Sequence, residues 1–579
     1  MGAFLALRRD RNADSTSATA SRIAKCFSAQ GFRDRHIIES ASWRVLVYRK
    51  LNCDHQNFLV EDSDNFIFVT GTFIYREAIG AKALESFFRD FRSGSINWNL
   101  LYGHYCIGVC VDRDLQIFVD RAGIYKVYLD SEERVFSSSF LAVLESLRSP
   151  HVNEQAIYEY VFQGATYGND TVVSEISLFG PERHAGASAA DNGGNPGPIL
   201  RPGFIEADRH SHVERNLSNL RSYFRAVTNV FGANIDCALS GGYDTRLLLA
   251  LLEERGVRPK LHVYGDAGDN DVRVAKLIAS GEGVELSHVD KSSYPVVAPD
   301  EYPAVVERNF LAFDGWPSDG IFDNGSDLQT RLDRCANAEL MLNGGGGEIF
   351  RNFFYLPDRP FSVKQLLWTF YSRFDPKVCT SAFSEEDYLS ALARKIRAVL
   401  GQDRDHLERS DIEFLYPGFR CRFWMGRNTS VNNRFGWALT PFSDPNIIED
   451  AIRVPLRYKS HGRFEARLIR ILNPRLAGYT SVYGHDFAED PPISRRIKDM
   501  ATLLRPPLVR RYTYRMRMRL PRSGTMPYFL KQQYIGETID QDFPYMSRFF
   551  HVREFKDAEQ YNRLCTLEYI FQRYNISLK

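Results

Sequence analysis

The 579-residue sequence lacks several features that would mark a particular class of protein. No apolar run approaches the ~20 residues that a membrane-spanning helix needs. Neither sign of charge is in excess, because the chain has 73 Lys and Arg residues and 72 Asp and Glu residues. No global field therefore favours nucleic acid or a membrane surface, and we expect neither as a partner.

Cysteine is scarce and unpatterned, with nine residues, an odd number, and no C-x-x-C pair. This usage predicts reduced thiols in a cytoplasmic protein and excludes a disulfide scaffold. The start of the chain has too short an apolar patch for a signal peptide, and its charges follow that patch. What is present is ordinary globular composition, 44% hydrophobic and 25% charged, with 41 Phe and 29 Tyr to fill large cores. These features indicate a soluble, multidomain enzyme.

The first 150 residues or so are rich in short runs of β-branched and aromatic residues, which predict strands. Helical periodicity appears at 81–91 and 140–147. Strands with few helices between them favour a sandwich-like layer with helices on its outer faces. The predicted strands are 42–49, 66–69, 105–111, 115–119 and 126–129.

A segment rich in Gly, Pro, Asn and Ala at 186–203 then indicates a loop or linker. Beyond it, helices and strands alternate, which favours βαβ units and a doubly wound parallel sheet. The rest of the chain after Phe350 is mostly helical by pattern. The predicted helices are 211–231, 244–254 and 271–280, and the strands are 234–239, 260–264 and 284–289.

A locally basic segment lies at 495–522. Its arginines indicate either a solvated or internally paired face, or a contact with an anionic partner or a membrane surface. The first interpretation is the plainer one.

One turn in the sequence carries a chemical signal. The strand ending at Leu239 runs directly into Ser240-Gly241-Gly242-Tyr243-Asp244-Thr245 and then into an apolar helix. A glycine turn at a helix N-terminus gathers backbone N–H groups and the positive end of the helix dipole, which suits a phosphate. A carboxylate at Asp244 then implies Mg²⁺ between it and a pyrophosphate. The alternative is a tight turn that only joins strand to helix.

The segment 239–245 resembles the pyrophosphate loop of the asparagine synthetase superfamily, which includes β-lactam synthetase and the lasso-peptide cyclases. Further segments resemble the same family in the same order, including one like its class-II glutamine amidotransferase domain. These segments are 103–109 and 120–128 (amidotransferase), 262–271, 341–350, 440–444 and 462–470.

The resemblance implies an α/β fold with two main parts. Residues 1–184 would form an Ntn-type, amidotransferase-like αββα sandwich, and 185–209 a linker. Residues 210–490 would form an α/β ATP-pyrophosphatase domain with helical additions, and 491–579 a helical, basic extension.

The resemblance also implies ATP and Mg²⁺ as cofactors and assigns residues to them. Pyrophosphate would be held by Ser240, Gly241, Gly242, Asp244 and Thr245, with Mg²⁺ on Asp244. The nucleoside would contact Leu239, Val263, Asn343 and Gly344, largely through backbone. The catalytic candidates are the acidic Glu348 and the cationic Lys459, Arg463 and Arg467.

Four positions depart from the family. Its N-terminal nucleophile, Cys, is absent, since the chain begins Met1-Gly2-Ala3, and its "NGEIYN" segment reads Thr70-Gly71-Thr72-Phe73-Ile74-Tyr75. The family's metal-binding Asp falls on Gly347, and its Lys on Ala466. We therefore expect no glutaminase activity.

The expected activity is an AMP-forming carboxylate–amine ligase, acting on a small or peptide acid with ammonia, a small amine or an internal amine. A homodimer is compatible with this interpretation. The alternatives are a nucleotide-binding scaffold that has lost catalysis and, more remotely, a sulfur- or tRNA-modifying enzyme on a similar fold.

Overall fold

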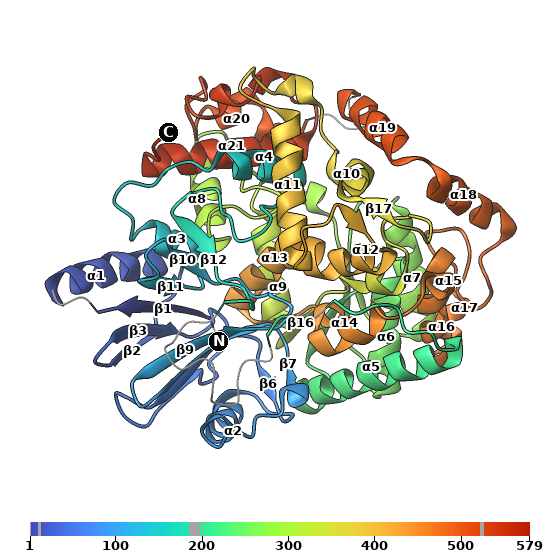
Figure 1. Cartoon of the computed structure of the whole chain (residues 1–579), viewed down its shortest axis with the longest axis horizontal. Helices are drawn as coiled ribbons and strands as arrows, with labels where there is room; N and C mark the ends of the chain where they lie inside the picture. Colours follow the sequence, from blue (N-terminus) through green and yellow to red (C-terminus); the bar gives the residue numbers. More distant parts are fainter. Residues whose placement is uncertain (1, 10–12, 184–196, 200, 521–525, 579) are drawn as a thin grey trace.

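The structure is a computed structural model that describes residues 2–9, 13–183, 197–199, 201–520 and 526–578. It is a mixed α/β fold with several sheets (Figure 1). Beside a short two-stranded sheet of β6 (Ile74–Tyr75) and β7 (Leu101–Tyr102), the N-terminal part contains two larger antiparallel sheets. The first has the order β12 (Ile176–Leu178), β10 (Tyr128–Asp130), β11 (Val135–Ser137), β1 (Ala3–Arg8), β3 (Trp43–Tyr48) and β2 (Arg35–Glu39). The second has the order β4 (Phe58–Val60), β5 (Phe66–Gly71), β8 (Tyr105–Val111) and β9 (Asp114–Val119).

The two antiparallel sheets bury one face each against the other. Alternate residues of the strands, such as Phe4, Phe68 and Cys106, form one apolar cluster between them. The residues between these, such as Leu5 and Ile67, join the larger core on the outer faces, as the two-residue period of a strand requires. Helices α1 (Ala13–Ala29) and α3 (Phe140–Leu144) contact the first sheet, and α2 (Gly80–Arg92) contacts the second. The expected sandwich with helices outside is therefore present.

Most predicted strands of this part are confirmed, and the predicted strands 105–111 and 115–119 form a hairpin of β8 and β9. Its turn residues Asp112 and Arg113 both have left-handed backbone angles, with φ of 49° and 74°. Several strands of this part were not predicted, among them the central strand β1. Ala3–Arg8 pairs with both β3 and β11, so the short apolar patch at the start of the chain is buried sheet. The helix expected over 140–147 ends earlier, at Leu144.

The second part is built on a five-stranded parallel sheet, as the alternating pattern predicted. Its order is β15 (Leu286–Val289), β14 (Lys260–Tyr264), β13 (Ile235–Ala238), β16 (Leu340–Leu342) and β19 (Trp437–Leu439). The chain moves from β13 outward to β15, then returns to the other side of β13 for β16 and β19. The strand order thus reverses between β13 and β16, and ligands of open α/β sheets bind at such a switch point.

The helices predicted between these strands are α5 (Arg209–Phe231), α6 (Tyr243–Glu254) and α7 (Asn270–Glu282). Helix α6 contacts α5 and also α16 (Arg463–Leu472) from much later in the chain. Helices α9 (Ser326–Asn337) and α13 (Gly426–Phe435) pack against the strands β16 and β19. The packing of these helices on the sheet buries β13, the strand that leads to the glycine turn.

The C-terminal third is mainly helical, as expected. It contains α11 (Glu385–Leu400), the π-helical segment η6 (Tyr416–Met425), α18 (Ile493–Leu504), α19 (Pro507–Arg519) and α21 (Ala558–Tyr574). Helix α21 returns to contact α4 (Glu154–Gln163) of the N-terminal part (Figure 1). The predicted limits of the domains stay predictions. Most of the predicted linker 185–209, namely 185–196 and residue 200, lies outside the described residues.

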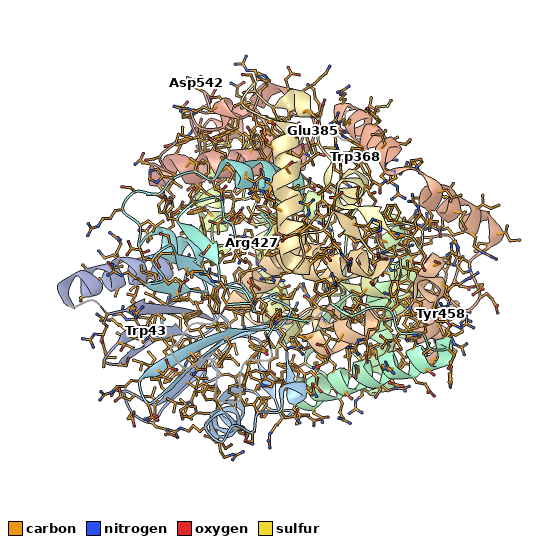
Figure 2. All side chains as sticks on the ribbon, in the orientation of Figure 1. Trp43, Trp368, Glu385, Arg427, Tyr458 and Asp542 are labelled. Carbon is orange, nitrogen blue, oxygen red and sulfur yellow. The ribbon has the colours of Figure 1, made fainter. Side chains whose placement is uncertain are left out.

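Buried polar contacts join the two parts. The Gly103 amide donates to the Asp444 carboxylate at 3.3 Å, and the Phe140 amide donates to the Asp314 carboxylate at 2.7 Å. Arg427, near the centre of the molecule in Figure 2, lies in the second part and donates to the Tyr128 hydroxyl of the N-terminal part. Buried charged groups with satisfied partners fix the relative placement of their elements, because an unpaired one would be costly.

Within the described ranges, none of the helices is both long and apolar enough to cross a bilayer.

Candidate functional site

The turn after β13 is shaped by its glycines and by bonds within the turn. A Cβ on Gly241 would lie 2.2 Å from the Val482 side chain, so only glycine fits there. The Ser240 amide donates to the Thr245 hydroxyl at 2.9 Å, which closes the turn onto the first residues of α6. The Gly241 amide donates to the carboxylate of Asp271 at 2.8 Å. This amide therefore already holds an anionic oxygen, supplied by the chain itself.

The loop after β16 lies against this turn. A Cβ on Gly344 would be 3.1 Å from the Thr245 methyl carbon and 3.3 Å from the Thr245 amide nitrogen. Asn343 is exposed, and its side-chain oxygen accepts from the Gly345 amide at 2.9 Å. The structure thus brings the two predicted glycine-rich segments together at the switch point of the sheet. Leu239 and Val263 are buried at the same carboxyl edge, at the ends of β13 and β14.

The cation of this site is Arg351, which the sequence did not single out. One of its terminal nitrogens (Nη2) lies 2.6 Å from Asp244 Oδ1. Its Nε lies 2.9 Å from Glu465 Oε2, and Nη2 lies 3.8 Å from Glu348 Oε1. Three carboxylates from three different elements therefore surround one guanidinium. Arg351 also packs over the ring of Tyr243, 5.2 Å from its centroid.

The surroundings of Asp244 and Glu465 in this cluster favour the protonated form of both carboxyl groups. Burial raises the pKa of Asp244 to about 6, against the opposing effect of Arg351. Burial, and then the neighbouring Asp244 carboxylate, raise the pKa of Glu465 well above its usual range. The carboxylates in turn hold the pKa of Arg351 well above its ordinary value, so it stays charged despite its burial. A single positive charge therefore faces three carboxyl groups, two of which bind a proton more readily than usual.

A cavity of about 240 Å³ opens beside the cluster. Glu348 and Arg351 line one side, and the Glu348 carboxylate accepts from the Tyr416 hydroxyl. The other walls come from the segment around Gly462 and from α18. Its remaining lining residues include Tyr243, Phe353, His461, Tyr483, Arg495 and Asp499. The space is large enough for a small polar group next to the carboxylates.

Of the three cations predicted for the site, none contacts Asp244 or Glu348. Lys459 is fully buried and pairs with Glu413 at 3.0 Å. Arg463 pairs with Asp490 at 3.4 Å, and Arg467 is on the exposed face of α16. The sequence held one feature that could have pointed to Arg351 as the cation of the site. Arg351 follows Glu348 by three residues, and that spacing brings two side chains to one side of a helical turn.

The described residues do not fit the Mg²⁺ that the resemblance implies. The carboxylate of Asp244 is engaged by Arg351, and a Cβ on Gly347 would lie 2.6 Å from Asp244 Oδ1. The room for a second carboxylate ligand at 347 is therefore filled by Asp244 itself. Across the described ranges, three or more His, Cys, Asp or Glu side chains nowhere gather in a way that could hold a metal ion.

At the start of the chain, residue 2 has no room for a side chain. A Cβ on Gly2 would lie 2.1 Å from the Arg49 carbonyl oxygen. The first thiol in the sequence is Cys26, which lies inside α1. Burial raises the pKa of Cys26 far above its ordinary value, which makes it a poor nucleophile.

Comparison of the chain with protein-family models and with curated proteins gives no match.

Proposed function

We propose that the chain is an ATP-dependent ligase that activates a carboxylate as an acyl-adenylate and transfers it to an amine, in the manner of the asparagine synthetase superfamily. The observation that carries this proposal is the meeting of two glycine-rich loops, 240–242 and 343–347, at the switch point of a parallel sheet. One loop opens a helix, and its Gly241 amide holds a carboxylate oxygen. Such an amide also suits a phosphate oxygen, which would displace Asp271.

In the proposed reaction, a carboxylate oxygen of the acid attacks the α-phosphorus of ATP, and the bond to pyrophosphate breaks. An amine then attacks the acyl carbon, loses a proton and displaces AMP. The amides of the turn, with Ser240 and Thr245, would bind the phosphates. Arg351, which lies 2.6 Å from Asp244 beside the turn, would balance the negative charge that grows on the leaving pyrophosphate.

Glu348 would face the acid or the amine from the adjoining cavity. Its carboxylate is held by the Tyr416 hydroxyl and lies among the lining residues of that space. A carboxylate in this position suits a cationic amine or takes up the proton that the attacking amine loses.

We assign the N-terminal sandwich to the amidotransferase-like part of the superfamily, without its glutaminase activity. Two face-to-face antiparallel sheets with helices outside support the assignment, as does the position of the segment 103–109 at the junction with Thr440 and Asp444. The amine would then come from solution or from the acid substrate itself.

A second candidate is a nucleotide-binding scaffold without catalysis. The ion pair between Arg351 and Asp244 favours it, because the carboxylate that would organise a metal–pyrophosphate complex is already neutralised. The absence of an acidic side chain at Gly347 points the same way.

The two candidates differ in one measurement. Isotope exchange between ATP and labelled pyrophosphate, run with a panel of amino acids and peptide acids, reports adenylate formation directly. The ligase predicts acid-dependent exchange that Ser240→Ala slows. ATP binding by calorimetry without exchange under any acid supports the scaffold, and the absence of nucleotide binding refutes both.

A further inference from the structure

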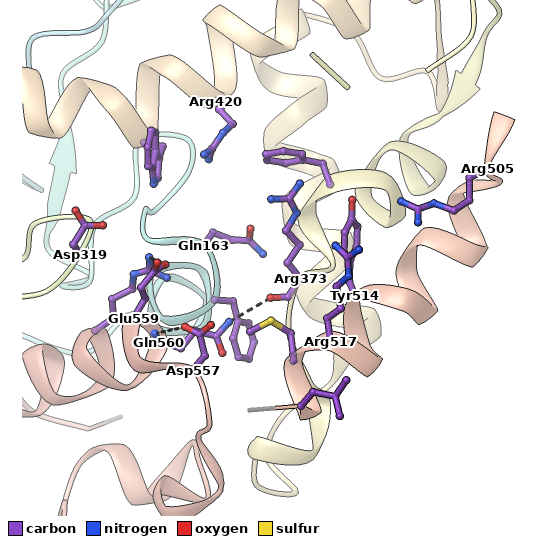
Figure 3. A pocket seen from close by; sticks show the side chains of 16 residues that line it. Gln163, Asp319, Arg373, Arg420, Arg505, Tyr514, Arg517, Asp557, Glu559 and Gln560 are labelled. Atoms are coloured by element: carbon purple, nitrogen blue, oxygen red, sulfur yellow. Dashed lines mark hydrogen bonds and ion pairs between the residues drawn. The ribbon is translucent and has the colours of Figure 1, made fainter. Parts of the chain in front are cut away.

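A second and larger cavity, of about 650 Å³, lies between α4, η4 (Leu367–Tyr371), η6, α19 and α21. None of its lining residues belongs to the glycine loops. Figure 3 shows Arg373, Arg420 and Arg505 reaching toward the open space from three different elements. Two more arginines, Arg517 and Arg563, complete a lining of five guanidinium groups against the three acids Asp319, Asp557 and Glu559.

Two of these arginines lie against aromatic rings. The Arg373 guanidinium is 4.3 Å from the ring centroid of Phe370 and 5.0 Å from that of Tyr514. The Arg420 guanidinium is 4.2 Å from the Trp424 ring centroid and 5.0 Å from that of Phe370. A stacked guanidinium keeps its N–H edge available in a fixed plane, which suits bidentate binding of phosphate or carboxylate.

The positive charge in this cavity is not balanced from within. Arg563 pairs with Glu559 at 3.2 Å. Within the ranges that the structure describes, no ion pair engages Arg373, Arg420, Arg505 or Arg517, and the buried Nε of Arg505 makes no hydrogen bond. Several like charges facing one space repel each other, so an anion in that space would be stabilising.

We propose that this cavity binds a ligand that carries at least two phosphate or carboxylate groups. The stacked arginines Arg373 and Arg420 would hold one group from one side, and Arg505 and Arg517 a second from the other. The rings between them offer an apolar surface for the body of the ligand. The site is separate from the nucleotide loops and does not depend on the function proposed for them.

The test is calorimetric titration at low salt with two probes, tripolyphosphate and citrate. We expect a single site for at least one probe, at least tenfold weaker in Arg373→Gln and in Arg420→Gln. Two variants should leave its affinity unchanged: Arg457→Gln, a surface arginine paired with Glu206, and Asp244→Asn in the glycine-loop site.

Because Arg420 is packed among aromatic rings, its variant could fail to fold. In that case Arg517→Gln provides the test, because Arg517 is exposed. Its loss should weaken binding of the same probe without changing the melting temperature of the protein. Binding that Asp244→Asn weakens but the arginine variants do not, or no binding of either probe, would overturn the proposal.

A different observation concerns the outer edge of the molecule, where α18 and α19 lie (Figure 1). Large apolar side chains are exposed at spacings of three and four residues along each helix, so each helix carries an apolar row, and the two rows together are called the stripe. Leu504 is 66% exposed and Ile493 is 73% exposed. The stripe consists of Ile493, Ile497, Met500, Leu504, Leu508, Val509, Tyr512, Met516 and Leu520.

Basic residues flank the stripe. Some arginines of the segment are paired internally, such as Arg511 and Arg515 with Glu385, which confirms part of the plainer interpretation. Arg496 and Lys498 are exposed beside the stripe and, within the described ranges, have no ion-pair partner. The segment 493–520 holds one acid, Asp499, and nine basic residues: Arg495, Arg496, Lys498, Arg505, Arg510, Arg511, Arg515, Arg517 and Arg519.

A second copy of the chain is disfavoured on this face, because the exposed Arg496 and Lys498 beside the stripe would face the same charges of the copy. An apolar stripe flanked by Lys and Arg suits the interface of an anionic bilayer. We infer that α18 and α19 dock the protein on an anionic membrane surface, a partner that the balanced charge of the whole chain did not predict.

Sedimentation with vesicles tests this inference. We expect the protein to bind vesicles of phosphatidylglycerol and phosphatidylcholine, but not of phosphatidylcholine alone. Leu504→Asp should lower the bound fraction at least fivefold, whereas Val296→Asp, at a residue 69% exposed elsewhere, should not. No binding to anionic vesicles, or a dimer in light scattering that Leu504→Asp dissociates, would overturn it.

Discussion

The guanidinium of Arg351 lies 2.6 Å from the carboxylate of Asp244, at the first turn of the helix that follows the glycine loop. The same guanidinium lies 2.9 Å from Glu465 on α16. A side chain of the protein thus supplies positive charge where the resemblance implied a metal ion.

Removing Arg351 should destabilise the fold and abolish pyrophosphate exchange. Arg351→Met leaves the carboxylates of Asp244, Glu348 and Glu465 without a counter-charge, and leaving a buried charge unpaired costs about 3 kcal/mol. Denaturant unfolding at pH 7.5 measures the loss. Arg463→Met, which removes an arginine of α16 paired with Asp490, is the matched control and should cost less than about 1 kcal/mol. Equal losses in the two variants would contradict the central place of Arg351.

Asp244 should make stability depend on pH in a defined direction. Its pKa of about 6 in the folded protein lies above the ordinary value of 3.8. Between these values the folded chain holds a proton that the unfolded chain has released, so the contribution to stability falls as the pH rises toward 6. Asp244→Asn removes this titration. We therefore expect the stability of the variant relative to wild type to rise between pH 4 and pH 7.

Denaturant unfolding of both proteins across that range checks the prediction. A constant difference in free energy of unfolding over the whole range would show that Asp244 titrates as an ordinary surface carboxylate. The ligase also predicts that Asp244→Asn loses exchange at every pH, since the cluster that positions Arg351 is disrupted.

Adding a methyl group at Gly347 should disturb the cluster more than adding one at Gly344. A Cβ at 347 would lie 2.6 Å from Asp244 Oδ1, whereas a Cβ at 344 would lie 3.1 Å from the Thr245 methyl carbon. We expect Gly347→Ala to cost about 2 kcal/mol and Gly344→Ala clearly less. Thermal unfolding compares the two variants directly. The variant Gly347→Asp puts back the aspartate that the family has at this position. It should also destabilise the fold, and Mg²⁺ should not raise its melting temperature.

The sequence predicted the fold best where local pattern and burial agree. The run from β13 through the glycine turn to α6 is a strand, a turn and an apolar helix by composition alone, and the structure has them within a residue or two. The parallel direction of the strands in this sheet was predicted from the alternation of helices and strands along the sequence. Ala3–Arg8 was missed because a short apolar run has no period of its own, and only its pairing with β3 and β11 makes it a strand.

The site was harder to predict because its charges meet through tertiary contacts. Glu465 lies on α16, over 200 residues after Asp244, and no local pattern shows that both face Arg351. Lys459 was a reasonable cation by type and position, but its buried partner is Glu413. Side-chain pairing across elements depends on the packed geometry, which motif matching does not contain.

The N-terminal part should not hydrolyse glutamine, and placing the missing cysteine at residue 2 should not restore that activity. A Cβ there would lie 2.1 Å from the Arg49 carbonyl oxygen and 2.8 Å from the Lys50 amide nitrogen, both of them backbone atoms that cannot move aside alone. Gly2→Cys should therefore cost about 2 kcal/mol or more by overpacking. Glutamate release from glutamine, measured with wild type, Gly2→Cys and Cys26→Ala, should stay at background in all three. Sustained release by Gly2→Cys at an unchanged melting temperature would show that the sandwich keeps a working glutamine pocket that only lacked its nucleophile.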